Sequence, residues 1–184
     1  LRVGANYSAK MVCSNVFLAG RSAEDVIRED LQAPGNPIMQ LFQVRVDREN
    51  NTVRAGLFGY IGNGLAVNRP GTGCATVPDG DLARAASVVS QPPLIAEPPT
   101  DQPWPSGSAA QSVPALQALV EQANLAGPGM RAIAVIHNGK LVAQSYGPGF
   151  SQSTPLLGWS MSKSVTAALV GMQIGDGKLS MRQA

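Results

Sequence analysis

Apolar and polar residues alternate along two neighbouring runs early in the chain, MQLFQVRVD (39–47) and TVRAGLFGY (52–60). Alternation with a period of two is typical of strands that bury one face, and the polar stretch between the runs is rich in turn-forming residues. We therefore expect an antiparallel hairpin here. The run GLAVNRPGTGCATV (64–77) predicts another short strand, broken by its proline and glycines.

Two segments carry the start signals of helices. Ser22 is a suitable N-cap for SAEDVIREDL, and the acidic residues that follow it suit the positive end of a helix dipole, so we expect a helix over residues 23–31. In SVPALQALVEQANLAG, Ser112 is the expected cap of an amphipathic helix that ends near Gly127. The first helix and the strands together predict a small α+β subdomain over residues 1–90.

A proline-rich segment divides the chain. Residues 91–111, QPPLIAEPPTDQPWPSGSAAQ, hold six of the 14 prolines. Proline lacks a backbone donor and favours extended conformations, so this composition predicts a linker rather than a helix or a sheet. We expect residues 112–184 to begin a second domain.

A second hairpin is expected after the linker. Two β-rich runs flank Asn138 and Gly139, the dipeptide that most favours a two-residue hairpin turn. The strands are expected at Ala132–Ile136 and Leu141–Ser145. His137 stands at the mouth of this turn, and the hairpin accounts for it as an exposed residue at a strand end without a catalytic role.

The segment GWSMSKSVTAALVGMQIGDGKL (158–179) contains a serine and a lysine three residues apart. Ser160 opens a helical pattern, and two glycines end it. The apolar stripe, which we expect to be buried, consists of Val165, Ala168, Leu169 and Met172. Three helical residues rise by about 4.5 Å and return to nearly the same face, so the ammonium of Lys163 can reach the Ser160 hydroxyl.

This spacing has a catalytic interpretation and a structural one. A serine hydroxyl becomes a nucleophile when a base removes its proton, and a lysine can be that base once burial or a nearby cation lowers its pKa from about 10.4. The amino-terminal end of a helix also offers N–H groups to an oxyanion. In the structural interpretation, Ser160 is an N-cap and Lys163 is solvated.

Composition excludes several classes of function. The 184 residues are 44% hydrophobic and 14% charged with a net charge of +2, as in an ordinary globular protein of one good-sized domain, or of a small domain and part of a larger one. The basic residues are scattered, which argues against nucleic acid as a partner, and no apolar run approaches the ~20 residues of a membrane span. With one histidine and two cysteines, no metal site and no cofactor are expected. Cys13 and Cys74 either form one disulfide or remain as two buried thiols.

The order of helix, Asn-Gly hairpin, loop and GWSMSKSVTAALVGMQIGDGKLSM resembles the entrance to the serine β-lactamase and penicillin-binding-protein superfamily. Within it, the sequence is most similar to class C β-lactamase-related esterases and amidases, including the 6-aminohexanoate-dimer hydrolases. The resemblance covers residues 112–184 well. It implies the amino-terminal part of an α+β fold in which helices flank an antiparallel sheet, preceded here by the small subdomain.

The resemblance also implies roles for two residues. Ser160 matches the acylated nucleophile, Lys163 matches its general base, and the Ser160 backbone N–H matches one half of the oxyanion hole. The family's second and third motifs lie downstream of this helix, and the sequence stops at Ala184. We therefore expect the 184 residues to be the amino-terminal part of a hydrolase, to need the remaining carboxy-terminal part as a partner, and to be inactive alone.

Some exported members of this superfamily carry an amino-terminal extension, which KMVCSNVFLAGRS and NRPGTGCA resemble. This similarity implies a periplasmic or secreted protein, whose signal peptide is not in this chain, and it favours a Cys13–Cys74 disulfide. Three functions remain open: a serine hydrolase that cleaves an amide, ester or β-lactam bond; a non-catalytic penicillin-binding-like ligand-binding or sensor protein; and a structural or interaction protein in which the serine and lysine are accidental.

Overall fold

The computed structural model describes residues 1–33, 37–88 and 99–182. It consists of two units, Leu1–Thr154 and Pro155–Ala184. The fold class is α+β with antiparallel sheets and helices, as predicted. Part of the predicted linker, residues 91–98, lies outside the described residues. The predicted domain boundaries therefore stay predictions.

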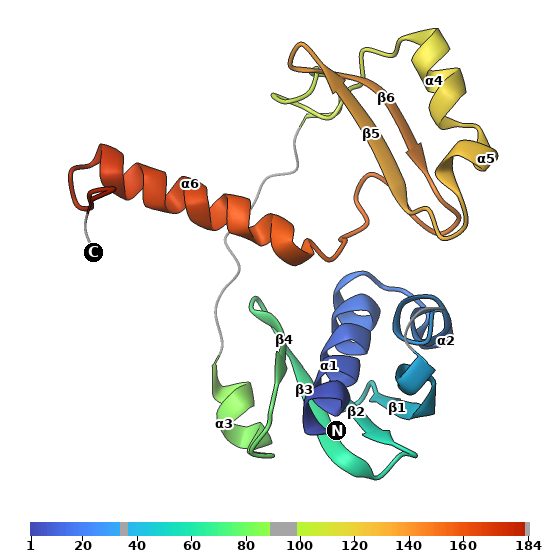
Figure 1. Ribbon diagram of the computed structural model, residues 1–184, viewed down its shortest axis with the longest axis vertical. Helices are drawn as coiled ribbons and strands as arrows, with labels where there is room; N and C mark the ends of the chain where they lie inside the picture. The colour runs from blue at the N-terminus through green and yellow to red at the C-terminus, as the bar shows by residue number, and fades with distance from the viewer. Residues whose placement is uncertain (34–36, 89–98, 183–184) are drawn as a thin grey trace. The chain divides into compact units, whose positions relative to one another are not determined.

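The first unit contains a four-stranded antiparallel sheet in the order β1-β2-β3-β4 (Figure 1). The predicted first hairpin is confirmed, because β1 and β2 pair across a short turn. The third run departs from the prediction: it does not hold one broken strand but two paired strands, since the turn after Arg69 sends the chain back. The strands are β1 (Phe42–Asp47), β2 (Thr52–Leu57), β3 (Ile61–Arg69) and β4 (Gly73–Thr76).

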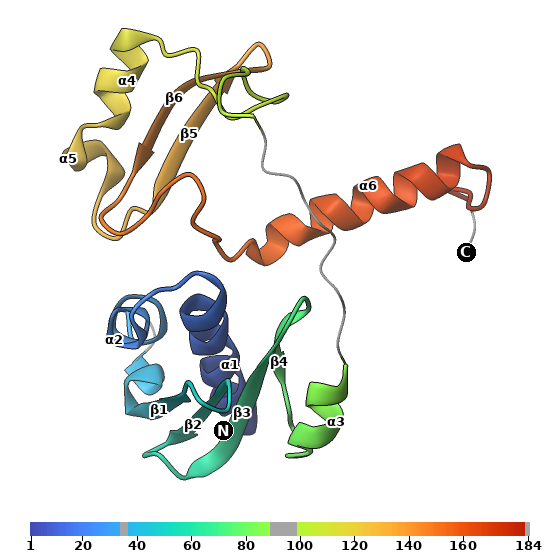
Figure 2. The ribbon, with the colours of Figure 1, turned by 180° about the vertical axis from the view of Figure 1, so that it is seen from behind.

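Helix α1 (Arg2–Cys13) was not predicted, and it continues as a π-helical turn over Ser14–Leu18. It packs against one face of the sheet, as the two opposite views show (Figures 1 and 2). Its buried residues Ala5, Ala9 and Val12 stand one turn apart. Small alanines give a weak hydrophobic pattern, which is why the sequence did not reveal this helix.

Two glycines in β3 allow α1 to approach the sheet closely. A Cβ built on Gly64 would lie 2.2 Å from the carbonyl oxygen of Ala5, and one built on Gly62 would lie 3.1 Å from the Ala5 Cβ. Contacts below 3.0 Å force a shift of the backbone. The backbones of helix and strand thus meet where side chains would otherwise separate them.

The remaining helices of the amino-terminal part are short. The predicted helix over 23–31 is confirmed as α2 (Ala23–Val26) and a π-helical turn (Ile27–Leu31), and the Ser22 hydroxyl accepts a hydrogen bond from the Asp25 N–H at 3.4 Å. A 3-10 helix spans Pro37–Leu41. Helix α3 (Leu82–Ser87) covers apolar residues on the sheet face opposite α1.

A disulfide joins α1 to β4 through Cys13 and Cys74, whose Cα atoms are 6.1 Å apart. This confirms the expected pairing and leaves no free thiol in the part of the chain that the structure describes. The bond fixes the carboxy-terminal end of α1 to the edge strand of the sheet. Both cysteines are buried in the core that α1 shares with the sheet.

The second half of the first unit contains the second predicted hairpin, which is confirmed. Strands β5 (Ala132–His137) and β6 (Lys140–Tyr146) pair antiparallel. Asn138 and Gly139 both adopt positive φ, at 50° and 73°, as a type I′ turn requires. His137 is exposed at the strand end, as expected.

The helix expected over 112–127 is shorter and interrupted. It divides into α4 (Pro114–Val120) and α5 (Ala123–Ala126), and its N-cap is Val113 instead of Ser112. The physical reason is that the N–H groups of Gln111 and Val113 bond to carbonyls of β6, which keeps this segment extended. Helix α4 then lies alongside β6 (Figure 1).

The amide side chain of Gln117 on α4 pairs with the backbone of β6. Its Nε2 donates to the Gln144 carbonyl at 2.8 Å, and its Oε1 accepts from the Gln144 N–H at 3.1 Å. The Gln117 side chain thus satisfies the N–H and the carbonyl of Gln144, to which a further strand would otherwise bond.

Replacing Gly64 by alanine should destabilise the first unit. The new methyl group collides with the backbone of α1, and overpacking of this kind costs about 1–3 kcal/mol or more. Urea unfolding of Gly64→Ala measures the loss. Gly171→Ala is the control, because nothing lies within 4 Å of a Cβ at that position. Equal stabilities of the wild type and Gly64→Ala would contradict the close approach of α1.

Removing the disulfide should destabilise the same unit. The bond joins residues separated by 61 positions, and closing a loop of that size is worth about 4 kcal/mol of unfolded-state entropy. Chemical denaturation of the Cys13→Ala/Cys74→Ala double variant, compared with the oxidised wild type, tests this value. A loss well below 1 kcal/mol would mean that other contacts already hold α1 on β4.

Candidate active site

Ser160 lies in a single 3-10 turn, Trp159–Met161, at the start of the helix in the second unit. Helix α6 itself spans Ser162–Gly175, and its N-cap is Met161. The prediction that Ser160 opens the α-helix is therefore wrong by two residues. The Met161 N–H donates to the Gly158 carbonyl at 2.9 Å, so the chain tightens into 3-10 geometry before the α-helix begins.

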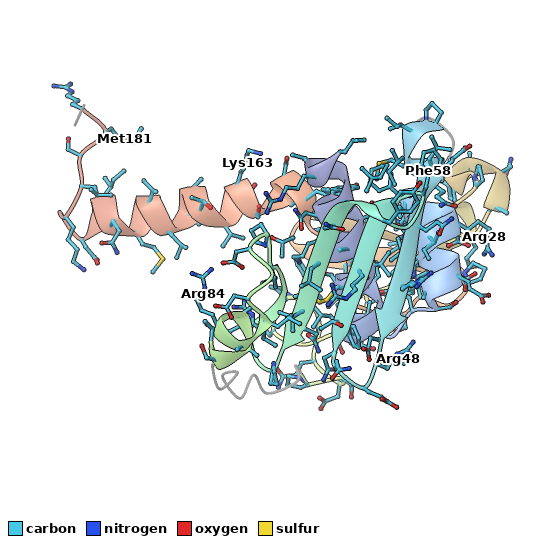
Figure 3. The ribbon with its side chains drawn as sticks, turned by 90° about the horizontal axis from the view of Figure 1, so that it is seen from below. Arg28, Arg48, Phe58, Arg84, Lys163 and Met181 are labelled. Carbon is cyan, nitrogen blue, oxygen red and sulfur yellow. A yellow bond between two sulfur atoms is a disulfide. The ribbon has the colours of Figure 1, made fainter. Side chains whose placement is uncertain are left out.

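The structure brings Ser160 and Lys163 together. The Lys163 Nζ donates a hydrogen bond to the Ser160 Oγ at 3.0 Å, and Figure 3 labels Lys163 near the start of α6. Both side chains are exposed. No acidic residue stands in the first turn of α6, and Lys163 forms no ion pair with any described carboxylate. The hydroxyl is thus the hydrogen-bond partner that the structure gives to this amine.

The polar groups around this pair hold the helix start in place. The Ser162 hydroxyl donates to the Trp159 carbonyl at 2.9 Å, and the Thr166 hydroxyl donates to the Ser162 carbonyl at 3.2 Å. Ser160 does not accept a capping hydrogen bond from α6, so its hydroxyl is not used as an N-cap. Its backbone N–H belongs to the first turn, where N–H groups lack intrahelical acceptors.

Trp159 has an unusual backbone conformation that sequence reasoning missed. Its φ of 44° lies in the left-handed region, which a bulky residue rarely adopts. Backbone outliers of this kind cost about 1–3 kcal/mol and concentrate at functional sites. The outlier immediately precedes Ser160 and sets the direction in which the 3-10 turn presents the serine.

The apolar stripe of α6 is exposed, contrary to the prediction that it is buried. The exposed fractions of Val165, Leu169 and Met172 are 63%, 57% and 64%. The physical reason is that Pro155–Ala184 contains no strand and no second α-helix in its described part. From Ala167 to Met172 the helix is apolar or glycine on every side, a composition typical of a helix buried on all sides.

A second lysine–serine contact exists in α1 and was also missed. The Lys10 Nζ donates to the Ser14 Oγ at 2.7 Å, and burial lowers the pKa of Lys10, as does the nearby Arg69. Ser14 is 5% exposed, however, so a substrate cannot reach its hydroxyl. Accessibility therefore favours Ser160 over Ser14 as the candidate nucleophile.

Metal and membrane sites receive no support from the described residues. Among residues 1–33, 37–88 and 99–182, no three or more His, Cys, Asp or Glu side chains gather in a way that would hold a metal ion. Within the same ranges, every helix is too short or too polar to cross a membrane.

Comparison with known proteins bears on this segment. Residues 115–183 match the Beta-lactamase family model. The match begins in α4, includes the β5–β6 hairpin and contains both Ser160 and Lys163. The match supports the assignment of this segment to the serine β-lactamase and penicillin-binding-protein superfamily. No curated protein and no solved structure matches the chain.

Proposed function

We propose that Ser160 is the nucleophile of a serine hydrolase that cleaves an amide, ester or β-lactam bond, with Lys163 as the general base. The observation that carries the proposal is the 3.0 Å hydrogen bond between the two side chains, within a segment that matches the Beta-lactamase family model. This distance lies within the range for direct proton transfer between a base and a nucleophile.

In the proposed reaction, the uncharged Lys163 amine takes the hydroxyl proton as Ser160 Oγ attacks the substrate carbonyl. The carbonyl oxygen becomes an oxyanion, which the Ser160 N–H stabilises as a hydrogen-bond donor. The intermediate collapses, the bond to the amine or alcohol breaks, and Lys163 returns the proton to this leaving group. Water then hydrolyses the acyl-serine ester, which releases the acid and restores the hydroxyl.

Within the superfamily, we propose a class C β-lactamase-related esterase or amidase of the 6-aminohexanoate-dimer hydrolase type. Its support is the sequence resemblance over residues 112–184. We also propose a periplasmic or secreted location. The Cys13–Cys74 disulfide supports this location, because such bonds persist in oxidising compartments.

A non-catalytic penicillin-binding-like ligand-binding or sensor protein is the alternative, and the exposure of both side chains is the observation that favours it. Repeated turnover needs a base in a site that excludes water, because desolvation favours an uncharged amine. A sensor would form the acyl-serine and keep it. A hydrolase would release the acid and turn over.

Substitution of Ser160 should abolish acylation, and substitution of Lys163 should slow it strongly. We expect no adduct on Ser160→Ala when the full-length protein is treated with a fluorophosphonate or a fluorescent penicillin. The free energy of unfolding should change by less than ~1 kcal/mol, since Ser160 is not an N-cap. We expect Lys163→Met to slow acylation by about 10²–10⁴-fold, the usual contribution of a general base. Intact-mass spectrometry measures the adducts.

The matched controls are Ser164→Ala, an exposed serine one turn further along, and Lys178→Met, which removes a lysine paired with Asp176. Both should be acylated like the wild type. An adduct of the same mass on Ser160→Ala would reject the assigned nucleophile. Rapid acylation without release of the acid would identify the sensor instead of the hydrolase.

We further propose that a carboxy-terminal part of the same fold covers α6 and supplies the second oxyanion donor. The exposed apolar side chains of α6 support this proposal. Residues 1–184 alone should then show no turnover of a p-nitrophenyl ester, because the absence of one oxyanion donor costs about 100-fold or more. Turnover by a longer polypeptide but not by residues 1–184 is the expected result, and an active 184-residue product would refute the proposal.

A further inference from the structure

An open hollow of about 710 Å³ lies in the first unit, and two arginines line it. Arg2 comes from the first turn of α1 and Arg54 from the middle of β2. Arg2 donates to the Pro78 carbonyl, which holds its guanidinium at the rim. Neither arginine forms an ion pair with a carboxylate in the part of the chain that the structure describes.

Arg54 faces another arginine in the sheet. Its neighbours Val53 and Ala55 pack into the core under α1, so alternation puts Arg54 on the opposite face. Figure 3 looks onto the sheet with α1 behind the strands. Directly across the β1–β2 pair stands Arg45, and like charges in directly opposed positions destabilise a sheet. Asp47, diagonally across the pair, offsets part of this repulsion, because hydrogen bonds from the hairpin turn, and with them the charge of Arg54, lower the pKa of its carboxyl. A bound anion would relieve this repulsion.

Arg2 has a similar conflict with its helix. The first turn of α1 carries no acidic residue and no side-chain cap, and the helix dipole makes this end positive. A cation is therefore disfavoured there unless a negative charge lies close by. Arg2, which the helix dipole disfavours, and Arg54, which faces another arginine, thus line the same hollow. Departures from local rules of this kind are expected at functional sites.

The other residues that line the hollow indicate which kind of anion it can bind. Pro78 provides exposed apolar surface, whereas Leu65 and Val77 are buried and contribute little, and the Asn63 amide adds a hydrogen-bond donor. The carboxylate in the lining, Asp79, is paired with Arg84. Guanidinium groups match the planar or tetrahedral oxygens of carboxylates and phosphates. The hollow therefore suits a small organic molecule that carries one such group.

We propose that the hollow bounded by Arg2 and Arg54 binds the carboxylate or phosphate group of a small organic anion. Its apolar part lies against Pro78, and its oxygens accept from the two guanidinium groups. This site is separate from the Ser160 chemistry and does not rest on the proposed function.

Calorimetric titration of the chain with phenyl phosphate, benzoate and inorganic phosphate at low ionic strength tests the proposal. We expect phenyl phosphate or benzoate to bind, with an affinity that falls as salt is added. The tighter of the two identifies the oxyanion, and weaker binding of inorganic phosphate than of phenyl phosphate shows that the apolar surface contributes. Absence of binding by all three probes overturns the proposal.

Three variants separate binding from folding. Arg54→Gln and Arg2→Gln should each weaken binding by roughly tenfold or more, as expected for loss of a charge-assisted hydrogen bond. Arg48→Gln removes the same charge from the turn of the same hairpin, outside the hollow, and should bind like the wild type.

Without a ligand, Arg54→Gln should unfold at about the same temperature as the wild type, because it removes both the repulsion from Arg45 and the weaker attraction to Asp47. With the ligand, the wild type should gain more in unfolding temperature than the variant does. Equal affinities in the wild type, Arg54→Gln and Arg2→Gln would overturn the proposal. An equal loss in Arg48→Gln would also overturn it, since it would reduce the effect to net charge.

Discussion

The contact between α1 and β3 is the constraint on which the amino-terminal part depends. Gly62 and Gly64 bring the two backbones so close that the Ala5 carbonyl occupies the place of a side chain. That approach positions Cys13 to reach Cys74, and it places the first turn of α1, with Arg2, beside the turn after β4. Core packing, the covalent link and the basic hollow are thus consequences of one helix–strand distance.

Local patterns predicted the elements whose cause is local. The alternation in β1 and β2, the Asn138-Gly139 turn and the Ser22 cap each depend on residues within a few positions of one another, and the structure confirms them. Helix α1 escaped detection because its buried face uses alanines, whose contribution depends on a glycine-lined partner some 60 residues away. Likewise, no local sequence signal predicts that the segment before α4 forms hydrogen bonds with β6, which is why the helix begins later than expected.

In the candidate site, too, features with a local cause could be predicted, and features that depend on the rest of the structure could not. Helical spacing was enough to predict that Lys163 reaches Ser160, and the 3.0 Å contact agrees with it. The 3-10 geometry and the left-handed Trp159 were beyond prediction, because both arise from how the preceding loop enters the helix. Burial of the apolar stripe was inferred from its helical spacing, yet burial requires a partner surface, which the described part of Pro155–Ala184 does not contain.

The side chain of Gln117 determines how the β5–β6 sheet can grow. Its amide imitates a neighbouring peptide group along β6, while residues 111–113 occupy further carbonyls of the same strand. An exposed edge strand can pair with a strand of another chain and so promote aggregation. A strand whose backbone N–H and C=O groups already have hydrogen-bond partners does not. A two-stranded sheet with one blocked edge can be extended only at the other. Any strand that joins this sheet must therefore pair with β5. The contacts of α4 and the segment before it with β6 thus determine the side on which the sheet can be extended.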